Sequence, residues 1–328
     1  MSWIDEFVGM LFPSDASSLK IEQAYMLKQQ NLPKSIFKYR GVNENSLKNL
    51  RENTVWLADP RSFNDPYDCS SFVDFDRMAN AIFKNPPKML VEKLTKHFSE
   101  DCVAEIEVIM RSAEDPQDAL YDEILKGMPT EQIAGIKKAL KEAEAKIYHD
   151  MVSKSSEAFK DGFKVCSFSE RNDSTLMWSH YADYHKGFCV EYSLQNTTSV
   201  DYLARFMYPV IYSEHPFDAT ESALRVGADT FNNLYLNKAG LIKSMDWAYE
   251  REWRLIFANG IFKSEQAYNV PTPKAVYLGS HISQENQDEV IGICEGKGIP
   301  VKKMKHSLSV FRMEAVDVKA ASGSAPVR

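Results

Sequence analysis

The sequence has neither the paired cysteines of a secreted domain nor the long apolar runs of a membrane protein. Its five cysteines are odd in number, widely spaced and without a Cys-x-x-Cys pair, which is typical of a reduced cytosol and argues against a disulfide framework or a zinc knuckle. The N-terminus lacks a basic leader, and its apolar stretch is too short to cross a bilayer. We therefore expect a cytoplasmic protein with no membrane span.

An excess of positive charge is also missing. The chain has 39 Lys and Arg against 46 Asp and Glu, which gives a formal net charge of −7. This balance argues against a protein that holds nucleic acid by bulk electrostatics, although it leaves room for a local basic groove.

The motifs that identify several enzyme classes are absent too. The chain has no Gly-x-Gly-x-x-Gly and no phosphate-binding P-loop, so the sequence supports neither a Rossmann enzyme nor a P-loop nucleotidase. It has no Gly-x-Ser-x-Gly elbow, which leaves little support for a Ser/His/Asp hydrolase. His180 and His185 lie about 140° apart around a predicted helix, so they cannot share one ion. We expect no metal site.

The chain is long enough for a sizeable core. Its 328 residues, 44% of them hydrophobic, suffice for one large domain or two small ones. We expect an N-terminal helical extension over residues 1–32, a single α+β domain over 33–317 and a disordered tail over 318–328. Residues from about 76 to 160 are charged and show helical spacing, which predicts a helical insertion peripheral to the sheet. Its last helix is expected from Glu131 to about Phe159.

Alternating apolar and polar residues predict the strands of the main domain. Strands are expected at residues 35–40, 55–58, 162–169, 188–192, 210–212, 275–278, 301–304 and 308–313. Capping residues and apolar stripes predict helices at 45–52, 174–185 and 284–297, together with a long helical stretch over 218–243. Strands and helices mixed in this way indicate an α+β fold.

The stretch from Trp247 to Phe257 is predicted to be a strand with two different faces. Its aromatic and aliphatic residues lie mostly on one face, while Glu250, Glu252 and Arg254 lie on the other. Two carboxylates at i and i+2 on one strand face repel each other, so they are more stable beside a cation or in a functional site. An edge strand with a solvated charged face is the alternative.

The loop after the predicted strand at 55–58 is dense in turn-forming residues. Two prolines stiffen it, and Asn64, Asp65 and Asp68 can bond its backbone. It is therefore either a structural Asx-turn loop or a rigid loop that grips a ligand.

Three short motifs follow one another along the predicted strands. Arg40 ends the first strand, Ser167 and Ser169 form a Ser-x-Ser on a middle strand, and Glu250 and Glu252 form a Glu-x-Glu on a late strand. This order resembles the Arg, Ser-x-Ser, Glu-x-Glu pattern of ADP-ribosyltransferases. The Ser-x-Ser has phenylalanine in the middle, where many transferases have threonine.

The chain also resembles an uncharacterised bacterial family known as domain of unknown function 2971, whose genes often lie near phage-defence genes. The resemblance rests on blocks at Phe37–Arg40, Ser62–Asp68, Cys166–Glu170, Met177–Ala182 with His185–Gly187, and Tyr249–Arg254. The predicted helical insertion lies between the second and third of these blocks.

The resemblance to ADP-ribosyltransferases implies a split antiparallel sheet and NAD as the cofactor. Cleavage of the bond between nicotinamide and ribose develops positive charge on the ribose, which a fixed carboxylate stabilises. Glu252 is expected to take this role and Glu250 to activate the acceptor. Arg40 matches the diphosphate, and Ser167 orients the ribose or the carboxylate. Further expected cofactor contacts are Ser169, Asn64, Asp65 and two aromatic residues that are also candidates for core packing, Tyr181 and Trp178.

We therefore expect NAD-dependent ADP-ribosyl transfer, or NAD cleavage, on an unknown macromolecular acceptor in bacterial anti-phage defence or in a toxin. A phage-derived trigger or an antitoxin is the expected partner. A catalytically silent sensor or binding module that uses the same cleft is the alternative, and a nuclease whose carboxylates bind a divalent cation is a third hypothesis. In the leading hypothesis, Arg40, Ser167 and Glu252 converge on one cleft.

Overall fold

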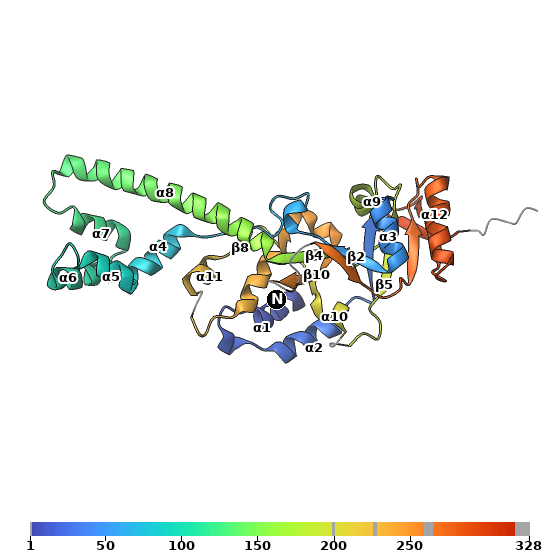
Figure 1. Cartoon of the computed structure of the whole chain (residues 1–328), viewed down its shortest axis with the longest axis horizontal. Coiled ribbons are helices and arrows are strands. Elements are labelled where there is room, and N and C mark those ends of the chain that lie inside the picture. The colour runs from blue at the N-terminus through green and yellow to red at the C-terminus, as the bar shows by residue number, and fades with distance from the viewer. Residues whose placement is uncertain (1, 199–200, 226–227, 259–260, 262–264, 319–328) are drawn as a thin grey trace, which may run out of the picture.

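The computed structural model describes residues 2–198, 201–225, 228–258, 261 and 265–318. These residues form the α+β fold expected from the sequence, built on an eight-stranded sheet (Figure 1). β12 and β13 pair in parallel, and the other neighbours in the sheet are antiparallel. In spatial order the strands are β14 (Met313–Asp317), β13 (Val301–His306), β12 (Ala275–Leu278), β5 (Phe188–Ser193), β1 (Ser35–Arg40), β4 (Phe163–Ser169), β10 (Glu252–Ala258) and β6 (Met207–Pro209).

Shorter elements surround this sheet. The two-stranded pairs are β2 (Thr54–Leu57) with β11 (Gln266–Asn269), β3 (Ser71–Phe72) with β8 (Phe217–Asp218), and β7 (Ile211–Ser213) with β9 (Ile242–Ser244). The helices of the main body are α1 (Trp3–Leu11), α2 (Ile21–Asn31), α3 (Glu44–Glu52), α9 (Thr175–Tyr181), α10 (Tyr202–Phe206), α11 (Thr220–Arg225) and α12 (Gln284–Glu295). Short 3-10 helices lie at η1 (Ala16–Ser18), η2 (Pro60–Ser62), η3 (Asn233–Gly240) and η4 (Met245–Glu250).

The sheet splits at its centre, between β1 and β4. These strands share the single residue pair Phe37–Ser169, whereas β1 pairs with β5 along its whole length. Farther along β4, Val165 exchanges two backbone hydrogen bonds of 2.9 Å with Ala58, the residue that follows β2. β4 thus changes partner along its length, and a gap opens between β1 and β4. The sheet is therefore split, as expected.

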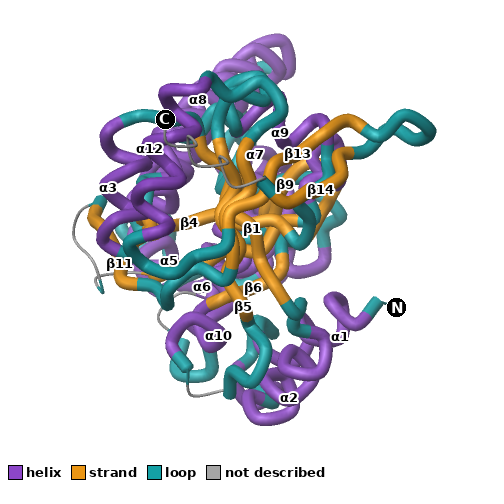
Figure 2. Tube along the Cα trace, turned by 90° about the vertical axis from the view of Figure 1, so that its right-hand side faces the viewer, coloured by secondary structure: helices purple, strands orange, loops and turns teal. Residues whose placement is uncertain are grey.

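Hydrophobic cores cover both faces of the sheet. Trp253, Leu255 and Phe257 of β10 join Phe168 of β4 in one core, which also includes residues of α3, α10 and α12. These three helices lie to one side of the central strands (Figure 2). Tyr39 of β1 packs with α9 in a core on the opposite face. Burial of each large apolar side chain stabilises the fold by roughly 1.5–3 kcal/mol. Because strand side chains alternate, the apolar residues of β10 direct its charged residues away from the first core.

The N-terminal helices dock on the main body. α1 begins with a capping box, in which the Ser2 hydroxyl accepts from the Asp5 N–H at 3.2 Å and the Asp5 carboxylate accepts from the Ser2 N–H at 2.8 Å. Phe7 of α1 is buried, and the Trp3 ring stacks on that of Trp253 with centroids 6.0 Å apart. The apolar face of α1 is therefore used within its own domain.

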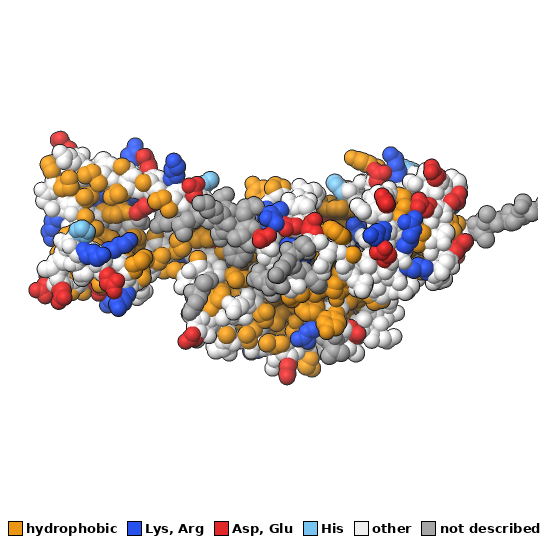
Figure 3. All heavy atoms as spheres, in the orientation of Figure 1, with side chains coloured by type: hydrophobic (Ala, Val, Ile, Leu, Met, Phe, Trp, Pro, Cys, Tyr) orange, Lys and Arg blue, Asp and Glu red, His pale blue; other side chains and the backbone are white. Residues whose placement is uncertain are grey.

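The segment expected to be a helical insertion is helical and stands away from the sheet (Figure 1). It consists of α4 (Phe75–Lys84), α5 (Lys88–Leu94), α6 (Glu100–Ser112), α7 (Pro116–Ile124) and α8 (Thr130–Asp161). Leu94, Ile106 and Met110 belong to a small core of its own. Hydrophobic side chains are also exposed over this insertion, Val108 and Met89 among them (Figure 3). Within the described ranges, neither α8 nor any other helix is long and apolar enough to cross a membrane.

The prediction of a long helical stretch over residues 218–243 is wrong. This stretch contains α11, the 3-10 helix η3 and the strand β9 instead. The Asn232 side chain accepts from the Leu234 N–H at 3.0 Å and donates to the Pro13 carbonyl at 2.8 Å, which fixes the start of η3. Such contacts with the N-terminal segment outweigh the helical propensity of the local sequence.

The strand predicted from Trp247 is shorter than expected. Residues 245–250 form η4, Arg251 has a left-handed φ of 44°, and β10 begins only at Glu252. The Ser244 hydroxyl caps η4 by accepting from the Asp246 N–H at 3.3 Å. This local side-chain hydrogen bond competes with strand formation, so Glu250 does not lie on the same strand as Glu252.

Two other element boundaries also differ from the prediction. The helix expected over 174–185 ends at Tyr181, because residues 183–185 adopt left-handed φ angles of 46°, 53° and 67°. Of the strand expected over 308–313, only Met313 belongs to a strand, β14. Residues 308–312 form the turn that joins β13 to β14, which the Ser307 N–H closes by donating to the Arg312 carbonyl at 3.0 Å.

We predict that Gly187→Ala destabilises the fold by about 3 kcal/mol, because an added Cβ would lie 2.0 Å from the Arg40 carbonyl oxygen. That carbonyl belongs to the ladder between β1 and β5 and cannot move freely. Gly135→Ala is the control, since nothing lies within 4 Å of its Cβ on α8, and it should stabilise by roughly 0.5–1 kcal/mol. Urea unfolding measures both, and equal effects would contradict the close approach.

Candidate functional site

A cavity of about 180 Å³ lies at the split of the sheet. It combines apolar walls with charged groups, and six of the residues expected at the site reach it: Asn64, Ser167, Ser169, Tyr181, Glu250 and Glu252. The remaining lining residues are Phe37, Lys38, Tyr39, Phe63, Asp68, Phe168, Met177 and Lys243. The cavity is therefore the candidate functional site.

Glu252, at the start of β10, is held by two cations. Its Oε1 accepts from Arg254 Nε at 2.8 Å, and its Oε2 accepts from Lys243 Nζ at 2.8 Å and from Arg254 Nη2 at 3.2 Å. The Arg254 side chain is 0% exposed and that of Glu252 is 2% exposed. Because buried charges are stable only when paired, this arrangement keeps Glu252 ionised beside the cavity.

Arg254 also ties the loop after β2 to the sheet. Its Nη1 and Nη2 donate to the two Asp68 carboxylate oxygens at 2.8 and 2.7 Å, a bidentate contact. Nη1 donates further to the Gly240 carbonyl at 2.9 Å. One guanidinium therefore connects the loop, the end of η3 and the strand β10.

Glu250 reaches the same cluster from the end of η4. Its Oε2 accepts from Lys243 Nζ at 2.6 Å, and its Oε1 accepts from the Tyr181 hydroxyl at 2.6 Å. The left-handed conformation of Arg251 turns the chain between the two glutamates, so both carboxylates contact one lysine although they lie on different elements. Lys243 is thus the cationic partner that the two glutamates require.

The two carboxyl groups have opposite pKa shifts. Burial raises the pKa of Glu250, and the neighbouring charge of Glu252 adds to this effect, although Lys243 acts against it. Burial would also raise the pKa of Glu252, but Arg254 and Lys243 outweigh it and hold that pKa well below its usual range. One carboxylate thus stays anionic while the other can exchange a proton nearer neutral pH.

The two serines of the Ser-x-Ser have different environments. The Ser169 hydroxyl donates to the Glu250 carbonyl at 2.6 Å and accepts from the Arg171 N–H at 3.2 Å, so it supports the turn before β10. Ser167 lines the cavity, and its hydroxyl has no hydrogen-bond partner within the described part of the chain. Ser167 is therefore the serine that is available to a ligand.

Lys38 is a cavity residue that the motif pattern missed. It lies on β1 and crosses the split, where its Nζ donates to the Ser167 carbonyl at 2.6 Å and stands 5.6 Å from the centre of the Phe168 ring. Burial lowers the pKa of this lysine. The sequence signals for Lys38 are its place in the Phe37–Arg40 block and its position two residues before Arg40 on the predicted strand.

The expectation that Arg40 shares one cleft with Ser167 and Glu252 is wrong. Arg40 pairs with Phe188 and, by strand alternation, is directed to the face opposite Ser169 and Glu252. It lines a neighbouring cavity of about 600 Å³ instead. The two cavities share three lining residues, Lys38, Tyr39 and Tyr181.

Two other expected contacts also lie outside the cavity. Trp178 is 0% exposed, its indole N–H donates to the Asn172 carbonyl at 2.7 Å and its ring packs edge-on to Tyr39, so it belongs to the core. Asp65 does not line the cavity, because its carboxylate accepts from the Trp247 indole N–H at 2.8 Å and anchors η4 to the loop.

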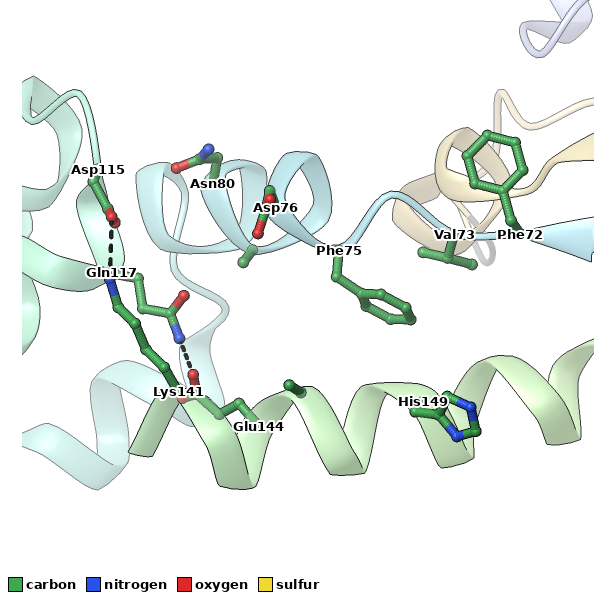
Figure 4. Close-up of a pocket in the computed structure, with 12 residues that line it drawn as sticks. Phe72, Val73, Phe75, Asp76, Asn80, Asp115, Gln117, Lys141, Glu144 and His149 are labelled. Carbon is green, nitrogen blue, oxygen red and sulfur yellow. Dashed lines mark hydrogen bonds and ion pairs between the residues drawn. The ribbon is translucent and has the colours of Figure 1, made fainter. Parts of the chain in front are cut away.

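The larger cavity in the helical insertion has a different character. It measures about 730 Å³ and lies between α4, the start of α7 and α8 (Figure 4). Its polar groups pair with one another, Gln117 with Glu144 and Lys141 with Asp115. No group of His, Cys, Asp or Glu within the described ranges, here or elsewhere, is arranged to hold a metal ion. The cavity at the split differs from this one because two carboxyl groups with opposite pKa shifts, Glu250 and Glu252, line it.

We predict that Arg254→Met destabilises the protein by about 3–5 kcal/mol, because the buried carboxylate of Asp68 loses its bidentate partner and that of Glu252 keeps Lys243 alone. Arg51→Met is the matched control. Arg51 pairs with Glu289 at 2.7 Å, but both side chains are more than 40% exposed, so its loss should cost less than about 1 kcal/mol. Urea unfolding of both variants measures the difference, and a cost for Arg254→Met as small as that of the control would contradict the pairing.

Stability should depend on pH through both glutamates, with opposite signs. The pKa of Glu250 is raised in the folded state, so its contribution is lost as pH rises from about 4.5, the usual value, through the folded pKa. The pKa of Glu252 is lowered, so its contribution is lost as pH falls below about 4.5. Urea unfolding between pH 3 and 8 should show that Glu250→Gln removes the first dependence and Glu252→Gln the second. The same pH profile for both variants would contradict the opposite shifts.

Residues 177–255 match a family model described as protein of unknown function (DUF2971). No match to the chain was found among curated proteins, and none among solved structures. The matched residues include Tyr181, Lys243 and both glutamates of the candidate site. In the segment that supplies most of the charged groups of the cavity, the chain is therefore similar to the DUF2971 family, as its motifs indicate.

Proposed function

We propose that the protein binds NAD at the split of the sheet and transfers its ADP-ribose group to an acceptor, or to water. The observation that carries this proposal is the pair of glutamates with opposite pKa shifts beside one cavity, together with the free hydroxyl of Ser167. Two such carboxyl groups are what a reaction through a ribosyl cation requires, one to stabilise positive charge and one to handle a proton.

In this reaction the bond between ribose C1′ and the nicotinamide nitrogen breaks, and its electron pair leaves with nicotinamide. The positive charge that develops on the ribose is stabilised by the fixed anion of Glu252. A nucleophile of the acceptor then bonds to C1′, and its proton passes to Glu250. When water is the nucleophile, the products are ADP-ribose and nicotinamide.

The hydrogen bonds of the cluster leave room for this ligand. A carboxylate has about four lone-pair sites. Glu252 accepts three hydrogen bonds and Glu250 accepts two, so each retains a site for a ribose hydroxyl. The cluster holds three carboxylates, those of Asp68, Glu250 and Glu252, against the cations of Lys243 and Arg254. This excess of negative charge favours a cationic transition state when all three carboxylates are ionised.

Cavity sizes indicate how the dinucleotide is placed. At about 180 Å³ the cavity at the split is smaller than the roughly 300–1,000 Å³ of ordinary ligand pockets, so it suits the nicotinamide end alone. The adjoining cavity of about 600 Å³ is lined by Arg40, Lys48 and His180. In this arrangement the two basic side chains face the diphosphate, and Arg40 keeps its expected role from the neighbouring cavity.

The acceptor in this proposal is a macromolecule, and the setting is bacterial defence against phage or a toxin, with a phage-derived trigger or an antitoxin as partner. These parts rest on the resemblance of the motifs rather than on a contact in the fold.

A binding module that uses the same cavity without turnover is the second candidate function. The observation that favours it is that the two cations already have carboxylate partners: Arg254 is fully buried, and Lys243 contacts both glutamates. Such a network can also serve only to hold the loop and the strands together. A module of this kind binds NAD, or a related anion, and releases no nicotinamide.

We predict that the protein releases nicotinamide from labelled NAD and that Glu252→Gln lowers this rate by about 10²–10³, since it removes a preorganised charge. Glu250→Gln should lower transfer to an acceptor while slow NAD hydrolysis persists. Ser167→Ala should lower the rate without loss of stability, because its hydroxyl holds no other group.

Glu289→Gln is the matched control, since that exposed glutamate lies on α12 and pairs only with Arg51 among the side chains of the described residues. The melting temperature of each variant is measured alongside, because Glu252 also holds Arg254. Full turnover in a folded Glu252→Gln variant would contradict the role of Glu252 in this mechanism. NAD binding without turnover in the unmodified protein would favour the binding module.

A further inference from the structure

We propose that His185, His281 and His306 form a binding site for a divalent transition metal of the zinc class. These histidines are distant in the sequence, but their rings meet beside the ends of β12 and β13. His185 lies in the turn between α9 and β5, His281 follows β12, and His306 ends β13. The site is separate from the cavity at the split, which none of the three lines.

The spacing of the three rings is the first argument. Their centroids lie 5.7 Å apart for His185 and His281, 5.2 Å for His185 and His306, and 5.7 Å for His281 and His306. Three imidazoles that bind one tetrahedral zinc at about 2.0–2.1 Å have ring centres roughly 5 Å apart. The spacing of the observed triangle is therefore close to that of a three-histidine site.

The hydrogen bonds of His185 supply the second argument. The Ser179 hydroxyl donates to the Thr175 carbonyl at 3.0 Å, so its oxygen is left to accept from Nε2 of His185 at 3.1 Å. The proton of a neutral His185 therefore resides on Nε2, and Nδ1 carries a lone pair. That Nδ1 is buried without a hydrogen-bond partner. A lone pair fixed in this way, with the other nitrogen held by a neighbour, is the usual state of a metal-binding histidine.

The backbone holds His185 firmly in this position. Its own φ of 67° and the left-handed angles of Asp183 and Tyr184 form a tight turn that few non-glycine residues adopt. The His281 N–H donates to the His185 carbonyl at 2.9 Å, and a Cβ on Gly279 would lie 2.1 Å from that oxygen. The loop after β12 is thus packed directly on the turn, which brings His281 to His185.

Binding requires the other two rings to turn. With the side chains as they stand, no His, Cys, Asp or Glu group in the described ranges is arranged as a ligand set. His281 and His306 are exposed, so rotation about their side-chain bonds disturbs no core packing. Three imidazoles with an open fourth position suit zinc, and imidazole nitrogen also accepts nickel and copper.

A metal here would stabilise the turn that follows α9. Ser179, which accepts from His185, lies on the same helix as Tyr181, which donates to Glu250 at 2.6 Å. The proposed ion is therefore structural in the first instance, and its binding does not depend on the proposed reaction.

The test is a titration of the metal-free full-length protein with Zn²⁺, followed by calorimetry and by the melting temperature. We expect one ion per chain and a rise in melting temperature on binding. His281→Ala and His306→Ala should each weaken binding by at least about tenfold and lower the rise at the same Zn²⁺ concentration. Because both side chains are exposed, these variants should fold normally without metal.

His215→Ala is the matched control, since this exposed histidine lies outside the cluster and should bind Zn²⁺ as the unmodified protein does. The proposal is wrong if the unmodified protein binds no stoichiometric Zn²⁺. It is equally wrong if His281→Ala and His306→Ala bind it as tightly as the control, because binding would then occur elsewhere.

Discussion

The buried guanidinium of Arg254 is the interaction on which the rest of the structure depends. It holds the carboxylates of Asp68 and Glu252 and the carbonyl of Gly240 in a region from which water is excluded. A buried charge of this kind is tolerated only when its hydrogen bonds are satisfied. The loop after β2, the end of η3 and the start of β10 therefore keep a fixed relation to one another, and the cavity at the split takes its shape from that relation.

The same network sets the electrostatics of the cavity. Arg254 and Lys243 keep Glu252 anionic, while burial beside that anion makes Glu250 harder to ionise. These groups, together with Ser167, line the cavity at the split between β1 and β4. In the proposed reaction, this fixed charge would stabilise a cationic transition state without reorganisation of the protein.

Part of this arrangement is predictable from the sequence, and the reason lies in periodicity. The alternation in β4 and β10 predicts which side chains meet, because antiparallel partners share a face, and Ser169 does lie opposite Glu252. Lys243 is not predictable, since it comes from a short strand inside a stretch with helical character. The placement of Glu250 depends on the Ser244 cap and the turn at Arg251, which are local features that override the strand pattern. The prediction for Arg40 is wrong for a different reason: the strand pattern holds there, and it directs Arg40 to the other face of the sheet.

The central claim is that NAD binds at the split with its nicotinamide end beside Ser167 and the two glutamates. The most direct measurement is a crystal structure of the protein with a non-hydrolysable NAD analogue. The account predicts the nicotinamide riboside end between β1 and β4, with a ribose hydroxyl on Glu252 and the diphosphate near Arg40 and Lys48. An analogue that binds in the insertion cavity, or that leaves the split empty at saturating concentration, would contradict it.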